Sequence, residues 1–160
     1  MEAARTRLHT IVATAVPRLL SLTEEEAAAR PYADKWSLKE TLGHLIDSAM
    51  NNHQRIVRMQ ATPDLGKFTY DQLHWVRSQR YQEEPWTELV GLWRAVNTHL
   101  AHTIGGIHPS ALGNVCDMGY PEPATLSFVV EDYLRHAEHH LAQIFSGDDP
   151  RHRTRWQVER

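Results

Sequence analysis

The sequence predicts an all-α protein, a four-helix bundle with two long crossing connections. Three observations support this fold class: four segments carry apolar residues at helical spacing, long irregular segments separate the last three of them, and no convincing β-hairpin or internal repeat is present. The four helical segments cover about residues 2–22, 37–59, 86–104 and 125–147.

The first two helices are predicted from apolar stripes. The first stripe holds Leu8, Ile11, Val12, Ala15, Val16 and Leu19. Pro17 lies inside this segment, so we expect the helix to kink or break there. The second helix begins at Ser37, which forms a capping box with Glu40. Its stripe holds Leu38, Leu42, Leu45, Ala49 and Ile56.

The last two helices follow the same periodicity. The third begins near Trp86 and ends at Gly105-Gly106, and its inward positions are Leu89, Val90, Trp93, Val96, Leu100 and Ile104. The fourth starts near Thr125 and stops at Gly147. The connections, 61–85 and 107–124, contain Gly and Pro, and a connection as long as the first is either functional or contains short helices.

Length and composition indicate one domain, residues 1–147, followed by a charged tail, residues 148–160. The formal charge of −3 disfavours nucleic acid as a partner, and no apolar run is long enough to span a membrane. The single cysteine, Cys116, cannot form an intramolecular disulfide, which fits a cytoplasmic protein, and we interpret it as incidental rather than functional.

Two histidines one helical turn apart, His136 and His140, are the strongest functional signal in a chain that contains 11 histidines. Residues at i and i+4 share a helix face, so both rings could bind one metal ion. On an ideal helix His139 falls opposite the apolar centre and should face solvent, whereas Asp132 and Gln143 share the face of His136. The alternative is that both histidines are hydrogen-bonded core residues.

A third ligand must come from another segment, and periodicity does not identify it. The candidates are His44, His74, His99, His102 and His108. His53 lies about 180° around the helix from His44, so those two cannot serve one site. The aromatic residues Trp75, Tyr81 and Trp86 either line a cleft or cover the bundle core.

The ordered motifs between about residues 30 and 144 resemble the DinB-like superfamily, and within it the YfiT subgroup of metal-dependent hydrolases and thiol transferases. The second helical segment resembles that family in its Trp36-Ser37 start, its His44-Leu45-Ile46-Asp47-Ser48 core and the following Asn51. The last helix resembles it from Tyr133 through His136-Ala137-Glu138-His139-His140 to Ile144, and His108-Pro109 stands where the subgroup has a His-Pro pair. Gln143 departs from the subgroup, which has His there, although Gln is common in the broader family.

The resemblance implies a metal held by His44, His136 and His140. It also implies one divalent ion per chain, zinc or nickel, and a homodimer. The expected function is that of a metal-dependent enzyme acting on a small molecule, either a hydrolase or a transferase that uses a low-molecular-weight thiol such as bacillithiol or mycothiol. The alternative is a non-catalytic metal-binding or dimerising bundle.

Further residues are predicted around this site. Asp47, three residues after His44, is a candidate proton acceptor or hydrogen-bond partner of a ligand; a surface carboxylate is the alternative. Asp132 and Gln143 are candidates for bonding the histidines or the substrate. His108 is a pocket candidate by resemblance only, and its alternative is a turn histidine that caps the chain before Pro109.

Overall fold

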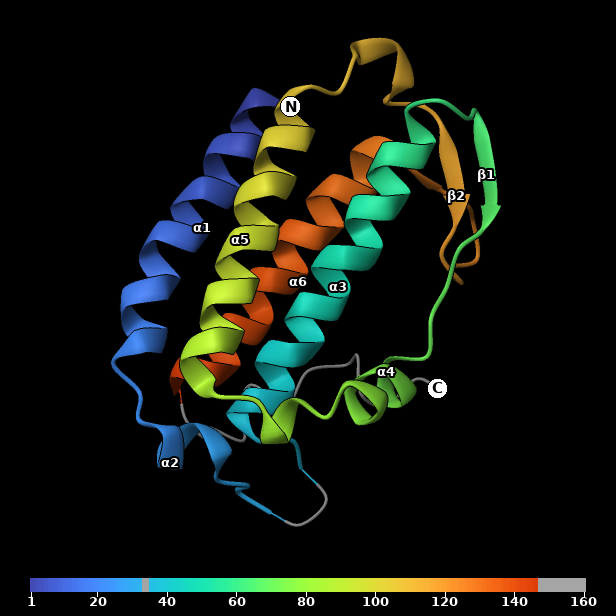
Figure 1. The fold of residues 1–160 in the computed structure, drawn as a ribbon. Helices are drawn as coiled ribbons and strands as arrows, with labels where there is room; N and C mark the ends of the chain where they lie inside the picture. Colours follow the sequence, from blue (N-terminus) through green and yellow to red (C-terminus); the bar gives the residue numbers. More distant parts are fainter. Residues whose placement is uncertain (33–34, 147–160) are drawn as a thin grey trace.

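The computed structural model describes residues 1–32 and 35–146, and its four long helices form a bundle (Figure 1). They are α1 (Glu2–Leu20), α3 (Leu38–Met59), α5 (Trp86–Gly105) and α6 (Leu126–Ser146). Helix α5 packs against α1 and α3, and α6 packs against α3 and α1, so each long helix has two neighbours. The predicted all-α four-helix bundle is confirmed.

The order of the helices in the bundle explains the long connections. Helices α3 and α5 run in one direction, and α1 and α6 run in the other (Figure 1). Because α3 and α5 are parallel neighbours, the chain between them must return along the whole bundle. This connection holds β1 (Asp64–Lys67), α4 (Gln72–Gln79) and the 3-10 helix η1 (Tyr81–Glu83). The expectation that it contains short helices is therefore correct.

The other connections stay at one end of the bundle each (Figure 1). Between α1 and α3 lies the short helix α2 (Glu24–Ala28), and between α5 and α6 lie the 3-10 helix η2 (Pro109–Ala111) and the strands β2 (Val115–Asp117) and β3 (Ala124–Thr125). Only the connection between α3 and α5 therefore runs the length of the bundle.

A small sheet joins the two long connections, in the order β1-β2-β3. Strand β1 is parallel to β2, and β2 is antiparallel to β3 with Val115 opposite Thr125 and Cys116 opposite Ala124. No hairpin is expected from the sequence, and that expectation is wrong, because β2 and β3 form one. Strands of two to four residues are too short to show the alternation of apolar and polar residues that identifies a strand.

The ends of the helices agree with the local sequence, with one correction. Ser37 Oγ accepts a hydrogen bond from Glu40 N, and Glu40 Oε2 accepts one from Ser37 N, so the capping box at the start of α3 is confirmed. Helix α1 continues through Pro17 to Leu20, so it does not break there. Pro17 removes only the bond to Ala13, and Ala13 is exposed, so water can satisfy its carbonyl.

The core fills the space between the four long helices. Its largest fully buried side chains include Trp86, Trp93, Tyr81 and Tyr133. Trp86 Nε1 donates a hydrogen bond to the carbonyl of Leu19, which ties the start of α5 to the end of α1. Within the described residues, no helix combines the length and the apolar content needed to cross a membrane. The predicted tail, residues 148–160, lies outside the described residues.

Candidate metal centre

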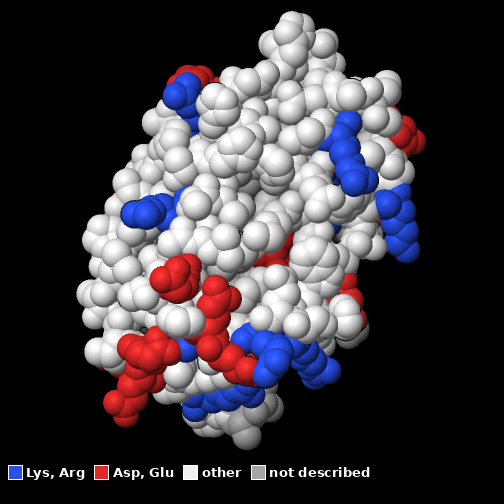
Figure 2. Space-filling view, viewed as in Figure 1, with Lys and Arg blue, Asp and Glu red and all other residues white. Residues whose placement is uncertain are grey.

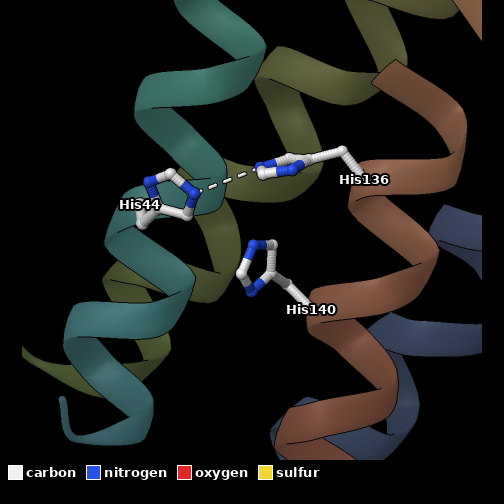
Figure 3. A group of neighbouring side chains, drawn as sticks. All are labelled: His44, His136 and His140. Carbon is white, nitrogen blue, oxygen red and sulfur yellow. Dashed lines mark hydrogen bonds between the residues drawn. The ribbon is translucent and has the colours of Figure 1, made fainter. Parts of the chain in front are cut away.

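Three histidines meet between two neighbouring antiparallel helices (Figure 3). His44 extends from α3, and His136 and His140 extend from α6 one turn apart. One ring nitrogen from each lies within 4.8 Å of the others, and His44 Nε2 is 3.1 Å from His136 Nε2. Among the described residues, this is the one group of three or more His, Cys, Asp or Glu side chains close enough to hold an ion.

The spacing of the three nitrogens fits a metal ion. Imidazole nitrogens that bind zinc tetrahedrally at 2.0–2.1 Å lie about 3.3 Å apart, close to the separation of the His44 and His136 nitrogens. In a metal-free pair of neutral rings, one of these two nitrogens must carry a proton and donate to the other. A bound ion would instead accept the lone pairs of both.

Burial keeps all three rings neutral, as metal ligands must be. Desolvation lowers the pKa of His136 to about 4 and that of His140 to about 3, and it holds the pKa of His44 well below its usual 6.5. Mutual repulsion lowers these values further, because each ring would carry its charge beside another histidine. At neutral pH the cluster therefore offers unprotonated nitrogens.

Gln143 orients one of the candidate ligands. Its Oε1 lies 2.7 Å from His140 Nδ1, and an amide oxygen can only accept, so Nδ1 carries the proton and Nε2 keeps its lone pair. The amide nitrogen of Gln143 lies 2.9 Å from His139 Nε2. His139 is half-buried, so the expectation that it simply faces solvent is wrong. His139 and Gln143 stand at i and i+4, so their contact follows the spacing of the helix.

Trp36 packs beside His44 from the segment before α3. Its ring centroid lies 5.3 Å from that of His44, and the tryptophan is half-buried. Trp36 was not among the predicted site residues, although its place next to the capping residue Ser37 was an available signal. An aromatic ring at this position helps to exclude water from the imidazole of His44.

Asp47 is fully buried one turn after His44 and anchors the long connection. Its Oδ1 accepts hydrogen bonds from Tyr81 Oη, at 2.6 Å, and from Gln79 Nε2, whereas its Oδ2 has no recorded partner among the described residues. Desolvation raises the pKa of Asp47 to about 6, although both hydrogen bonds lower it. The alternative of a surface carboxylate is therefore excluded, and a catalytic role remains a prediction.

Asp132 and His108 are engaged elsewhere. Asp132 accepts hydrogen bonds from Tyr120 and Arg135 rather than from a histidine. His108 is exposed, and its Nδ1 accepts from the backbone N–H of Ser110 at the start of η2. That segment lies at the end of the bundle opposite the start of α3 (Figure 1), so the structure favours the capping interpretation of His108.

The remaining candidates lie outside the cluster. His99 and His102 are on α5, and His74 is on α4. Trp86 belongs to the core, Tyr81 bonds Asp47, and Trp75 packs against Tyr70. Cys116 is buried, and desolvation raises the pKa of its thiol, which makes it a poor nucleophile.

The fold and this histidine cluster together describe a four-helix bundle with a triad of neutral imidazoles between two of its helices. A family model described as the DinB superfamily matches residues 4–144. The chain therefore belongs to the DinB superfamily, as the motifs around His44 and His136 predict.

A solved structure shows the same fold. It is YfiT from Bacillus subtilis, a probable metal-dependent hydrolase with an unusual four-helix bundle topology, with a TM-score of 0.78 and 17% sequence identity over 89% of this chain and 82% of that chain. No curated protein matches this sequence. At this identity the likeness concerns the fold.

Proposed function

We propose that the protein is a metal-dependent enzyme whose divalent ion is held by His44, His136 and His140. The observation that supports this most is the convergence of three neutral imidazoles from adjacent helices, with one nitrogen of each within 4.8 Å of the others. Since the cluster has three members, an ion held there keeps coordination positions for a small molecule, which is typical of catalytic rather than structural sites.

The chemistry follows from this donor set. Zinc and nickel both suit imidazole ligands, and either ion, when bound, supplies a Lewis acid that lowers the pKa of a small nucleophile such as water or a thiol. The proposed reaction is therefore hydrolysis or transfer to a low-molecular-weight thiol. The metal-dependent hydrolase activity attributed to YfiT supports the first form, and the motif resemblance supports both.

The surrounding residues have separate proposed roles. Gln143 fixes the proton of His140 on Nδ1, and Trp36 shields His44 from water. Asp47 is the proposed proton acceptor, because burial raises its pKa to about 6, close to the pH at which a general base works best. Its variant Asp47→Asn should reduce turnover while leaving the metal content unchanged.

Metal analysis of the purified protein tests the ligand assignment. We expect one divalent ion per chain in the wild type and loss of that ion in His44→Gln, His136→Gln and His140→Gln, with circular dichroism to confirm folding. His9→Gln is the matched control, because His9 is exposed on α1. Fully loaded ligand variants would refute the site.

Activity assays then separate enzyme from non-catalytic bundle. The metal-loaded protein is incubated with an electrophile together with bacillithiol, mycothiol, glutathione or no thiol, and with ester and amide substrates. Metal-dependent turnover that requires a thiol indicates a transferase, and turnover with water alone indicates a hydrolase. If the loaded protein shows neither, and chelation mainly lowers the melting temperature, the metal is structural.

A further inference from the structure

A second group of histidines lies on the other face of α3. His53 is about 180° around the helix from His44, so it points away from the candidate metal centre. His99 and His102 extend from α5, the neighbour of α3 on that side. The ring centroids of His53 and His99 lie 5.2 Å apart, and those of His99 and His102 lie 6.4 Å apart.

The rings of His53 and His99 border a groove of about 450 Å³ between α3 and α5. Its lining is Met50, His53, Gln54, Ala95, Val96 and His99, which includes no carboxylate and no Lys or Arg. Figure 2 shows the same character on this face: charged side chains gather toward its lower end, and the surface over the middle of α3 and α5 is mostly white. The histidines of the groove therefore have no acidic neighbour to pair with in its lining.

The ring nitrogens of His53 and His99 are available to a ligand. Across residues 1–32 and 35–146, no side-chain hydrogen bond or ion pair is recorded for either ring, in contrast to His140, which bonds Gln143. His53 is half-buried and His99 is exposed, so an ion could reach them from solvent. Two imidazoles held on rigid neighbouring helices are preorganised to bind one ion together.

We propose that His53 and His99 form a second metal site that binds a transition-metal ion, copper(II) most tightly, through these two imidazoles. The donor type favours copper(II), because imidazole binds it well and copper(II) stands highest in the divalent series. The hard cations Mg²⁺ and Ca²⁺ prefer oxygen ligands, and the groove offers no carboxylate.

Copper(II) titration of the full chain tests the site by calorimetry and electron paramagnetic resonance. The His44→Gln variant serves as parent because it disables the proposed triad, and zinc-saturated wild type serves as a second parent. We expect one tight copper site in each parent. In His53→Gln and in His99→Gln the copper affinity should fall roughly 100-fold, because losing one of two linked ligands removes the chelate advantage.

The remaining variants serve as controls. His102→Gln should leave binding nearly unchanged, because His102 does not line the groove. His9→Gln should also leave it unchanged, because His9 is an exposed histidine on α1. The resonance spectrum of the parent should show coupling to more than one nitrogen, and that of His53→Gln should lose one. If the double variant His53→Gln/His99→Gln binds copper as the parent does, the second site is refuted.

Discussion

Acid should destabilise the metal-free protein through its buried histidines. The folded-state pKa values of His136 and His140 are about 4 and about 3, both below the ordinary 6.5. As the pH falls below 6.5, the unfolded chain binds protons that the folded chain refuses, so stability falls with pH. Between pH 6.5 and 4.5 each histidine costs about 2.7 kcal/mol, at about 1.36 kcal/mol per pH unit.

Asp47 has the opposite effect on stability, which it increases as the pH falls. Its folded-state pKa of about 6 lies above the ordinary 3.8, so Asp47 takes up its proton at a higher pH in the folded chain than in the unfolded chain. Between pH 6 and 4.5 this adds about 2 kcal/mol of stability, and the net loss from the three groups is about 3 kcal/mol. His44, whose pKa is also lowered, increases the loss. Against a typical stability of 5–15 kcal/mol, this change is easily measured.

Urea unfolding of the metal-free protein at several pH values between 7.5 and 4.5 measures this loss. The variant Asp47→Asn keeps an oxygen that can accept from Tyr81 but cannot titrate, so its stability should fall by about 5 kcal/mol over the same range. In Asp47→Asn, which lacks the opposing effect of Asp47, a stability that does not change with pH would show that the histidines are protonated freely in the folded state. Equal slopes for the wild type and Asp47→Asn would refute the raised pKa of Asp47.

Three further predictions concern the packing and the metal. A Cβ at Gly43 would lie 2.1 Å from Cδ2 of the Tyr81 ring, so Gly43→Ala should destabilise the protein by about 1–3 kcal/mol in urea unfolding. Gly91 lies in a helix with open space around it, so Gly91→Ala should stabilise the protein by about 0.5–1 kcal/mol. Equal effects of the two variants would contradict the contact between Gly43 and Tyr81. Gln143→Leu removes the acceptor of His140 Nδ1 and should weaken metal binding about 10- to 100-fold in a chelator competition, whereas Gln143→Glu should retain it. Protons compete with the metal for His136 and His140 only below a pH of about 4, so the bound metal should survive dialysis at pH 5. Release of the metal near pH 6.5 would show that the ligand histidines keep their ordinary pKa and are exposed to water.

Much of the fold was predictable because it depends on local sequence. Apolar spacing identified the four long helices, and Ser37 with Glu40 marked the start of α3 within a residue or two. The small sheet was not predictable, because β2 and β3 are only three and two residues long and β1 pairs with β2 from a distant part of the chain. The continuity of α1 through Pro17 also depended on solvent exposure, which the local pattern does not show.

Some residues of the candidate site could also be predicted from local sequence, and others could not. Helical spacing placed His136 and His140 on one face, and it placed Gln143 near them. Spacing could not select His44 from the other histidines, since His136 is 92 residues away in the chain, and the choice depended on the motif resemblance. The same spacing argument suggested Asp132 as a partner of His136, but its hydrogen bonds go to Tyr120 and Arg135.

By itself, the sequence determined which residues form helices and which pairs share a helix face, because both follow from the repeat of one helix. Only the tertiary structure decided that α6 lies beside α3, which brings His44 against His136 and His140. It also decided that Asp47 is buried against Tyr81 and that His53 meets His99 across the other face of α3. These contacts join segments far apart in the chain, so they depend on how whole helices pack and not on any local pattern.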